Sequence, residues 1–139
     1  MFAASASVPM MSLAGLMFSP TQSRISFTNK EKELGLTCSI SKTHKSGKND
    51  KYWFAFHPHQ QVFLSEFPVS YVAYGCGSSD NTFLFPFEIF EPLIKNMWTT
   101  ESEDRMYWHV VILQRDEKFL LQQPKNEKQD LLDITKYKI

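Results

Sequence analysis

Short runs of alternating apolar and polar residues, separated by turn-forming residues, fill the chain from Arg24 onward. Residues 24–28 (RISFT) and 35–41 (GLTCSIS) alternate on either side of a polar turn, which predicts a hairpin. Two further pairs of runs flank turns of Gly, Ser, Asp, Asn or charged residues: 69–74 (VSYVAY) with 82–85 (TFLF), and 106–113 (MYWHVVIL) with 118–122 (KFLLQ). This pattern is typical of a mainly antiparallel sheet.

Other segments depart from that alternation. Residues 52–56 (YWFAF) are continuously apolar, which predicts a central strand covered on both faces. After Pro86, a residue suited to a helix entry, apolar side chains recur at helical spacing. Shorter helices are predicted over residues 60–66 and near residues 131–137. Together these patterns predict an α+β fold: a mostly antiparallel, twisted sheet of about six or seven strands with one main helix, about residues 87–98, packed on a face.

The first 23 residues differ from the rest because they contain no charged side chain and four of the six Met. Their apolar run is broken by Pro9 and Pro20 and is too short to span a bilayer. A secretory signal would begin with positive charge, which is absent here. We therefore expect a poorly ordered or loosely docked lead-in over residues 1–23, a single domain over residues 24–139, and no membrane partner. An atypical leader, or the remnant of a longer parent protein, is the alternative.

Composition narrows the class of protein. The 139 residues are 42% hydrophobic and 14% aromatic, enough for a compact core without disulfides. Fifteen basic residues balance fifteen acidic ones, so any contact with nucleic acid must come from local clustering of charge. Cys38 and Cys76 have neither zinc-knuckle nor disulfide-framework spacing. Buried free thiols in a reducing, cytoplasmic compartment are the expectation.

The strongest local cluster of charge is the stretch SKTHKSGKNDK, residues 41–51, which contains a single acid, Asp50. Lysines at this density can neutralise phosphates, and an adjacent aromatic ring can stack on an unpaired base. The simpler interpretation is that these lysines only solvate a loop, while YWFAF forms core. The predicted nucleic-acid contacts are Lys42, His44, Lys45, Lys48, Lys51 and Tyr52.

Histidines offer a second candidate site. His57 and His59 lie two residues apart, and His109 lies in another predicted strand, so three imidazoles could bind a metal ion. However, Pro58 is expected to end the first strand, and HPHQ is typical of a cap leading into the next helix. We therefore predict no metal and no cofactor, and expect His109 to be a strand histidine with a hydrogen-bond partner.

Acidic residues offer a third candidate, because carboxylates near a lysine can hold the divalent metal of a nuclease. Asp80 and Glu88 are the residues that would serve. Glu88 and Glu91 also suit the first turn of a helix, and TTESED (residues 99–104) is typical of a solvated turn. P-loop, GxGxxG and Ser-His-Asp patterns are absent, and Cys76 has no neighbouring base in the sequence.

The order of YWFAFHP, SYVAYGC, FLFPFEIFEPL and YWHVVI, over about residues 35–113, resembles the C-terminal half of PD-(D/E)xK-type nuclease and restriction-associated domains. In that family the strand before a Lys-rich loop carries an acid, any residue and then lysine. Here the matching stretch reads Ile40, Ser41 and Lys42, so the acid is missing, and RISFT lacks the earlier aspartate. The resemblance implies a truncated or degenerate relative, or a domain that binds nucleic acid without cutting it.

These observations favour a non-catalytic domain that interacts with DNA or RNA through the loop from Lys42 to Lys51. Such a domain would be a fragment or degenerate relative of a restriction or mobile-element nuclease. Two alternatives stay open: a divalent-metal nuclease that uses Asp80 or Glu88, and a protein-interaction or structural domain whose lysines have no specific role.

Overall fold

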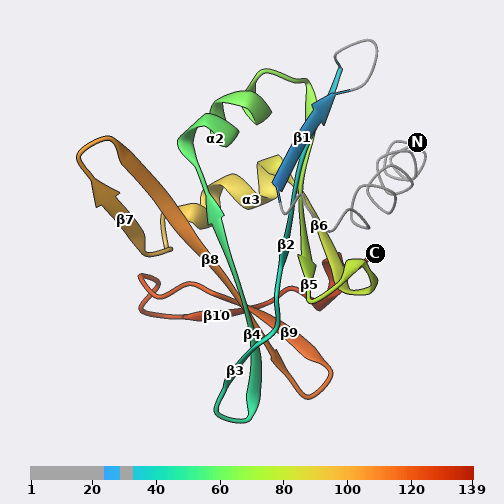
Figure 1. Cartoon of the computed structure of the whole chain (residues 1–139), viewed down its shortest axis with the longest axis vertical. Helices are drawn as coiled ribbons and strands as arrows, with labels where there is room; N and C mark the ends of the chain where they lie inside the picture. The colour runs from blue at the N-terminus through green and yellow to red at the C-terminus, as the bar shows by residue number, and fades with distance from the viewer. Residues whose placement is uncertain (1–23, 29–32) are drawn as a thin grey trace.

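The computed structural model describes residues 24–28 and 33–139, which form two sheets and two α-helices (Figure 1). The strand order is β1-β2-β5-β6 in a four-stranded sheet and β10-β9-β8-β4-β3 in a six-stranded sheet, in which β7 pairs with β8. The predicted α+β class with mainly antiparallel strands is confirmed, with the strands shared between two sheets instead of one. The predicted lead-in, residues 1–23, lies outside the described residues.

The four-stranded sheet begins with the predicted hairpin. Strand β1 (Arg24–Thr28) pairs antiparallel with β2 (Leu34–Ser41). The chain then enters the other sheet and returns through α2, so β2 pairs parallel with β5 (Val69–Cys76). Strand β6 (Thr82–Pro86) follows the short 3-10 helix η1 (Ser79–Asn81) and pairs antiparallel with β5.

The six-stranded sheet contains the predicted β8–β9 hairpin and three strands that the sequence pattern did not predict. Its strands are β3 (His44–Ser46), β4 (Asn49–Phe56), β7 (Thr99–Ser102), β8 (Arg105–Arg115), β9 (Lys118–Gln122) and β10 (Leu131–Asp133). Strand β3 lies in the predicted loop, and β7 lies in the predicted solvated turn. Strand β10 and the 3-10 helix η2 (Thr135–Tyr137) replace the helix predicted near residues 131–137. These pieces of three or four residues are strands because a neighbouring strand supplies their hydrogen bonds.

Both principal helices occur where the sequence predicted them, with different ends. Helix α2 (Pro58–Ser65) begins at Pro58, and His57 caps it with Gln60: the His57 backbone N–H donates to Gln60 Oε1 over 2.9 Å. Helix α3 (Phe87–Ile94) stops well before residue 98. It ends there because the backbone N–H groups of Asn96 and Met97 donate to carbonyls only three residues back, those of Leu93 and Ile94. This spacing forms turns and not a further turn of α-helix.

The main hydrophobic cluster lies between the inner faces of the two sheets and the two helices. Tyr52, Phe54 and Phe56 of β4 point into this cluster and are at most 3% exposed, while Trp53 is 39% exposed. The prediction that YWFAF is covered on both faces is therefore wrong, because its alternate residues face opposite sides of the sheet. This leaves Trp53 on the outer face of the six-stranded sheet.

Both cysteines are buried free thiols, as predicted from their spacing. Cys76 belongs to the main cluster, and Cys38 belongs to a smaller cluster with Leu36, Tyr71 and Leu84 on the other face of the four-stranded sheet. Burial raises the pKa of Cys38 to about 12 and raises that of Cys76 further still. Across the described part of the chain, the helices are too short or too polar to cross a membrane.

Candidate nucleic-acid interface

Residues 42–51 form a protruding hairpin, which we call the basic hairpin; it projects at the bottom of the view in Figure 1. Its strands β3 and β4 pair His44 with Lys51 and Lys45 with Asp50. Paired residues point to the same side of a sheet, and successive residues point to opposite sides. His44 and Lys51 therefore share the outer face with Trp53, whereas Lys45 and Asp50 lie on the opposite face. The predicted contact residues do not all lie on one surface.

Lys45 is the lysine whose charge is compensated within the hairpin. Its ammonium group donates to the Asp50 carboxylate, and this hydrogen bond raises the pKa of Lys45. Lys42, Lys48 and Lys51 have no carboxylate partner among the residues that the structure describes. The first two are exposed and Lys51 is half-buried, so these three carry the positive charge available to a ligand.

Tyr52 is not at the surface, so its predicted role as a ligand contact is wrong. The side chain is 3% exposed, and its hydroxyl donates to Gln114 Oε1 over 3.1 Å. Burial raises the pKa of this hydroxyl group. The reason is the alternation of β4, in which Tyr52 shares the inner face with Phe54 and its neighbour Trp53 takes the outer face.

Trp53 is held in place by a chain of hydrogen bonds. Its indole Nε1–H donates to His109 Nδ1 over 2.9 Å, and His109 Nε2 lies 2.6 Å from Thr100 Oγ1. Because an indole can only donate, His109 Nδ1 accepts, and in the neutral imidazole Nε2 then donates to Thr100. The prediction that His109 is a strand histidine with a hydrogen-bond partner is confirmed.

Five partly exposed rings follow one another across this surface, and we call them the ring series: His59, His57, Tyr107, His109 and Trp53. Successive ring centroids are 5.2, 5.6, 5.2 and 5.7 Å apart. The rings come from the start of α2 and from strands β8 and β4. His57 and His59 stack on each other, with 22° between their planes, and Tyr107 separates them from His109 along the series.

Trp53 lines two hollows and is the residue that they share. One of about 430 Å³ is lined by His44, Lys45, Ser46, Lys51 and Trp53. The other, of about 290 Å³, is lined by Ser39, Ile40, Trp53, Phe54, Ala55, His57, Arg105 and Tyr107. Their sizes are at the low end of the range of about 300 to 1,000 Å³ for ligand pockets. Trp53 therefore contributes to two small depressions, one lined also by lysine and the other by arginine.

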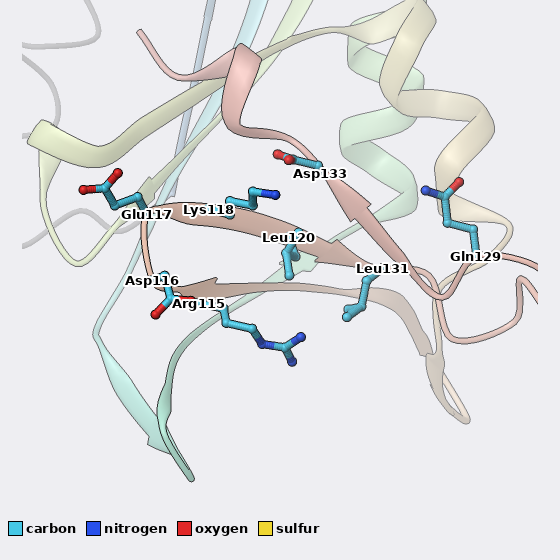
Figure 2. A pocket seen from close by; sticks show the side chains of 8 residues that line it. All are labelled: Arg115, Asp116, Glu117, Lys118, Leu120, Gln129, Leu131 and Asp133. Atoms are coloured by element: carbon cyan, nitrogen blue, oxygen red, sulfur yellow. The ribbon is translucent and has the colours of Figure 1, made fainter.

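A larger hollow of about 820 Å³ lies elsewhere, over β8, β9 and β10. Figure 2 shows charged side chains around Leu120 and Leu131 in this hollow. Its basic residues, Arg115 and Lys118, are outnumbered by acids: Asp116, Glu117 and Asp133. A polyanion would be repelled by this local excess of negative charge, so the hollow is a poorer nucleic-acid site than the surroundings of Trp53.

The carboxylates of the nuclease alternative belong to elements other than the basic hairpin. Asp80 is exposed on η1, and Glu88 is exposed on the first turn of α3. Glu88 lines a cleft of about 530 Å³ together with Glu91, whose carboxylate accepts a hydrogen bond from Gln61. In residues 24–28 and 33–139, no three His, Cys, Asp or Glu side chains gather as a metal site would require.

Comparison with known proteins gives no relative: no family model, no curated protein and no solved structure matches the chain. The resemblance to PD-(D/E)xK-type domains stays a prediction. Lys42, the motif residue that this sequence retains, is exposed directly after β2.

Four residues of this surface were not identified from the sequence: Trp53, Tyr107, Thr100 and Arg105. For one of them, Trp53, the sequence does contain a signal. Lys51, Trp53 and Ala55 occupy alternate positions of the strand, and the lysine marks that side as the polar one. The other three could not be found, because the pairing of Ala55 with His109 joins segments more than fifty positions apart.

Proposed function

We propose that this protein binds nucleic acid without cutting it, on the outer face of the six-stranded sheet around Trp53. The observation that carries the proposal is the placement of an exposed, hydrogen-bonded indole beside available lysine. Trp53 follows Lys51 on the same face of β4, and His44 lies opposite Lys51 on β3. Aromatic surface next to ammonium groups is the combination that contacts bases and phosphates together.

Basic side chains near Trp53 support contacts with phosphates. Lys42, Lys48 and Lys51 belong to the basic hairpin, and Arg105 lines the smaller hollow together with Trp53. Glu103 and Asp104, exposed beside Arg105, reduce the positive potential there. Because the whole chain carries no net charge, attraction must be short-range, and binding should depend strongly on salt.

Binding of labelled oligonucleotides, measured by fluorescence anisotropy over a salt series, tests this function. Three phosphate contacts predict a slope of log affinity against log salt of about −2 on a single strand and about −3 on a duplex. Replacement of Lys42, Lys48 and Lys51 by Ala should remove most of that slope and leave the thermal midpoint unchanged. Absence of binding to either form at low salt would overturn the proposal.

The basic hairpin supplies its own matched control. Lys45 and Asp50 form an ion pair, so the combined variant Lys45→Gln with Asp50→Asn keeps the net charge and should keep the slope. Because Lys45 also lines a hollow with Trp53, the salt slope, and not the affinity, is the readout of this control. A loss of slope in this control would mean that the lysines act only through the overall charge of the hairpin. The same oligonucleotides incubated with Mg²⁺ or Mn²⁺ should stay intact, and cleavage would contradict the non-catalytic part of the proposal.

A further inference from the structure

We infer that the ligand is single-stranded nucleic acid, with unpaired bases stacked against Trp53 and its neighbours in the ring series. This inference rests on the proposed function and specifies the form of nucleic acid that the site accepts. It is carried by the arrangement of the five rings, the hydrogen bonds that fix Trp53, and the two hollows beside it.

Trp53 offers a fixed ring to a base. The indole plane stands at 78° to the Tyr107 ring and at 63° to the His109 ring, so neither neighbour lies flat on it. Trp53 lines two hollows, and both open to solvent. We expect a planar base that enters either hollow to reach the exposed indole, and every base has a face with which it can stack.

The hydrogen bonds of Trp53 reduce the cost of ordering this platform. Thr100 contacts His109, and His109 accepts from the indole, so the orientation of an exposed side chain is set before any ligand arrives. Less side-chain freedom is then lost on binding, which is the usual advantage of a preorganised site.

A single strand fits this surface better than a duplex. Bases in a duplex are stacked on one another, so their faces cannot reach Tyr107 or Trp53. The rings lie on the sheet and at the start of α2, whereas major-groove reading needs a helix or two-stranded ribbon that enters the groove. The basic hairpin is the element with that ribbon shape, so preferential duplex binding would assign recognition to the hairpin and overturn the inference.

Basic side chains lie at two positions around the ring series. Lys51 and His44 are next to Trp53, and Arg105 is next to Tyr107. A sugar-phosphate backbone could contact these side chains on either side while its bases face the rings. This placement of cations beside aromatic rings is what we expect of a single-strand site and is not required for packing.

The test compares four ligands of about 12 nucleotides: oligo-dT, oligo-dA, their duplex, and an abasic strand of equal charge. We expect either single strand to bind at least about 10-fold more tightly than the abasic strand or the duplex. Trp53→Leu should weaken binding to the single strands by about 10-fold, and Trp53→Phe should weaken it less, by about 3-fold, because Phe can stack but lacks the N–H that bonds His109. The salt slope should be the same in all three proteins.

Tyr107→Leu gives a second, independent measurement, and the thermal midpoint of each variant shows that it is folded. The inference would be overturned if the abasic strand bound as tightly as oligo-dT and oligo-dA, or if neither Trp53→Leu nor Tyr107→Leu weakened binding. In that case a salt slope of the expected size would still support the proposed function. Failure of every ligand to bind at low salt would overturn both. The two failures are therefore distinguishable.

Discussion

Trp53 on β4 donates its indole N–H to Nδ1 of His109 on β8, 2.9 Å away across the outer face of the six-stranded sheet. The bond joins neighbouring strands diagonally, since Trp53 pairs with Val111 and His109 pairs with Ala55. The small side chain of Ala55 leaves the imidazole room beside the indole. One hydrogen bond therefore defines the orientation of an exposed ring at the centre of the proposed site.

Loss of His109 should free Trp53 without unfolding the protein. In His109→Leu the indole loses its acceptor and gains rotamers, so its fluorescence anisotropy should fall relative to the wild type. Affinity for a single strand should drop by about 3- to 10-fold with no change in the salt slope, because preorganisation is lost and the cations remain.

Thr100→Val is the matched control for that variant. It removes the hydroxyl that contacts His109 Nε2 and leaves the Trp53 bond in place. The free energy of unfolding should fall by about 0.5–1.5 kcal/mol, while affinity should change by less than in His109→Leu. If the two variants weaken binding equally, the direct bond to Trp53 has no special role.

Much of the fold could be predicted from local pattern. The β1–β2 and β8–β9 hairpins need only alternation and a turn between neighbouring segments, and both were found. The parallel pairing of β2 with β5 could not be found, because it joins strands separated by a hairpin and a helix. Strand β10 could not be found either, since its three residues acquire a strand conformation from β9.

The site could be predicted only in part, again because strand pairing decides which residues lie together. The lysines of the basic hairpin stand out in the sequence, but which of them share a face depends on the register of β3 with β4. The choice between Tyr52 and Trp53 depended on which side of β4 meets the core. Continuous apolar sequence hides that choice, and Lys51 was the available guide.

Gly35 should not tolerate a side chain. A Cβ at this position would clash with the ring of Phe67, which itself packs on Phe63. Gly35→Ala should therefore lower the free energy of unfolding by about 1–3 kcal/mol, measured by chemical denaturation. In the background of Phe67→Ala the same substitution should cost much less, and an equal cost in both backgrounds would show that the ring is not the obstacle.

The buried thiols predict a loss of stability at alkaline pH. The pKa of Cys38 is raised to about 12 in the folded protein, so the unfolded chain ionises this thiol first. Stability is thus fully present below about pH 8.5 and declines as the pH rises toward the folded value, by about 1.4 kcal/mol per pH unit per thiol. Burial of Cys76 acts in the same direction.

Chemical denaturation between about pH 8 and 10 measures that slope. Cys38→Ala should lower stability at about pH 8, where both thiols are still protonated, and should reduce the slope, and Cys76→Ala should do the same. Native protein should react with a thiol reagent far more slowly than unfolded protein. A Cys38→Ala slope equal to that of the wild type would contradict the assignment of the pH dependence to this thiol.

Tyr52 and Trp53 are adjacent aromatic residues with opposite roles, and exchanging each for Phe separates those roles. Tyr52→Phe removes a hydroxyl that donates to Gln114 inside the fold. It should lower the free energy of unfolding by about 0.5–1.5 kcal/mol and leave nucleic-acid affinity unchanged, because the ring never reaches the ligand. Trp53→Phe should lower stability little and weaken binding by about 3-fold, since its exposed ring still stacks but has no N–H to bond His109. Replacement by Leu sharpens the contrast: at position 53 it should weaken binding to a single strand, and at position 52 it should act on stability alone. A Tyr52→Leu protein that is folded at the assay temperature yet binds more weakly than Trp53→Leu would place the ligand on the wrong side of β4.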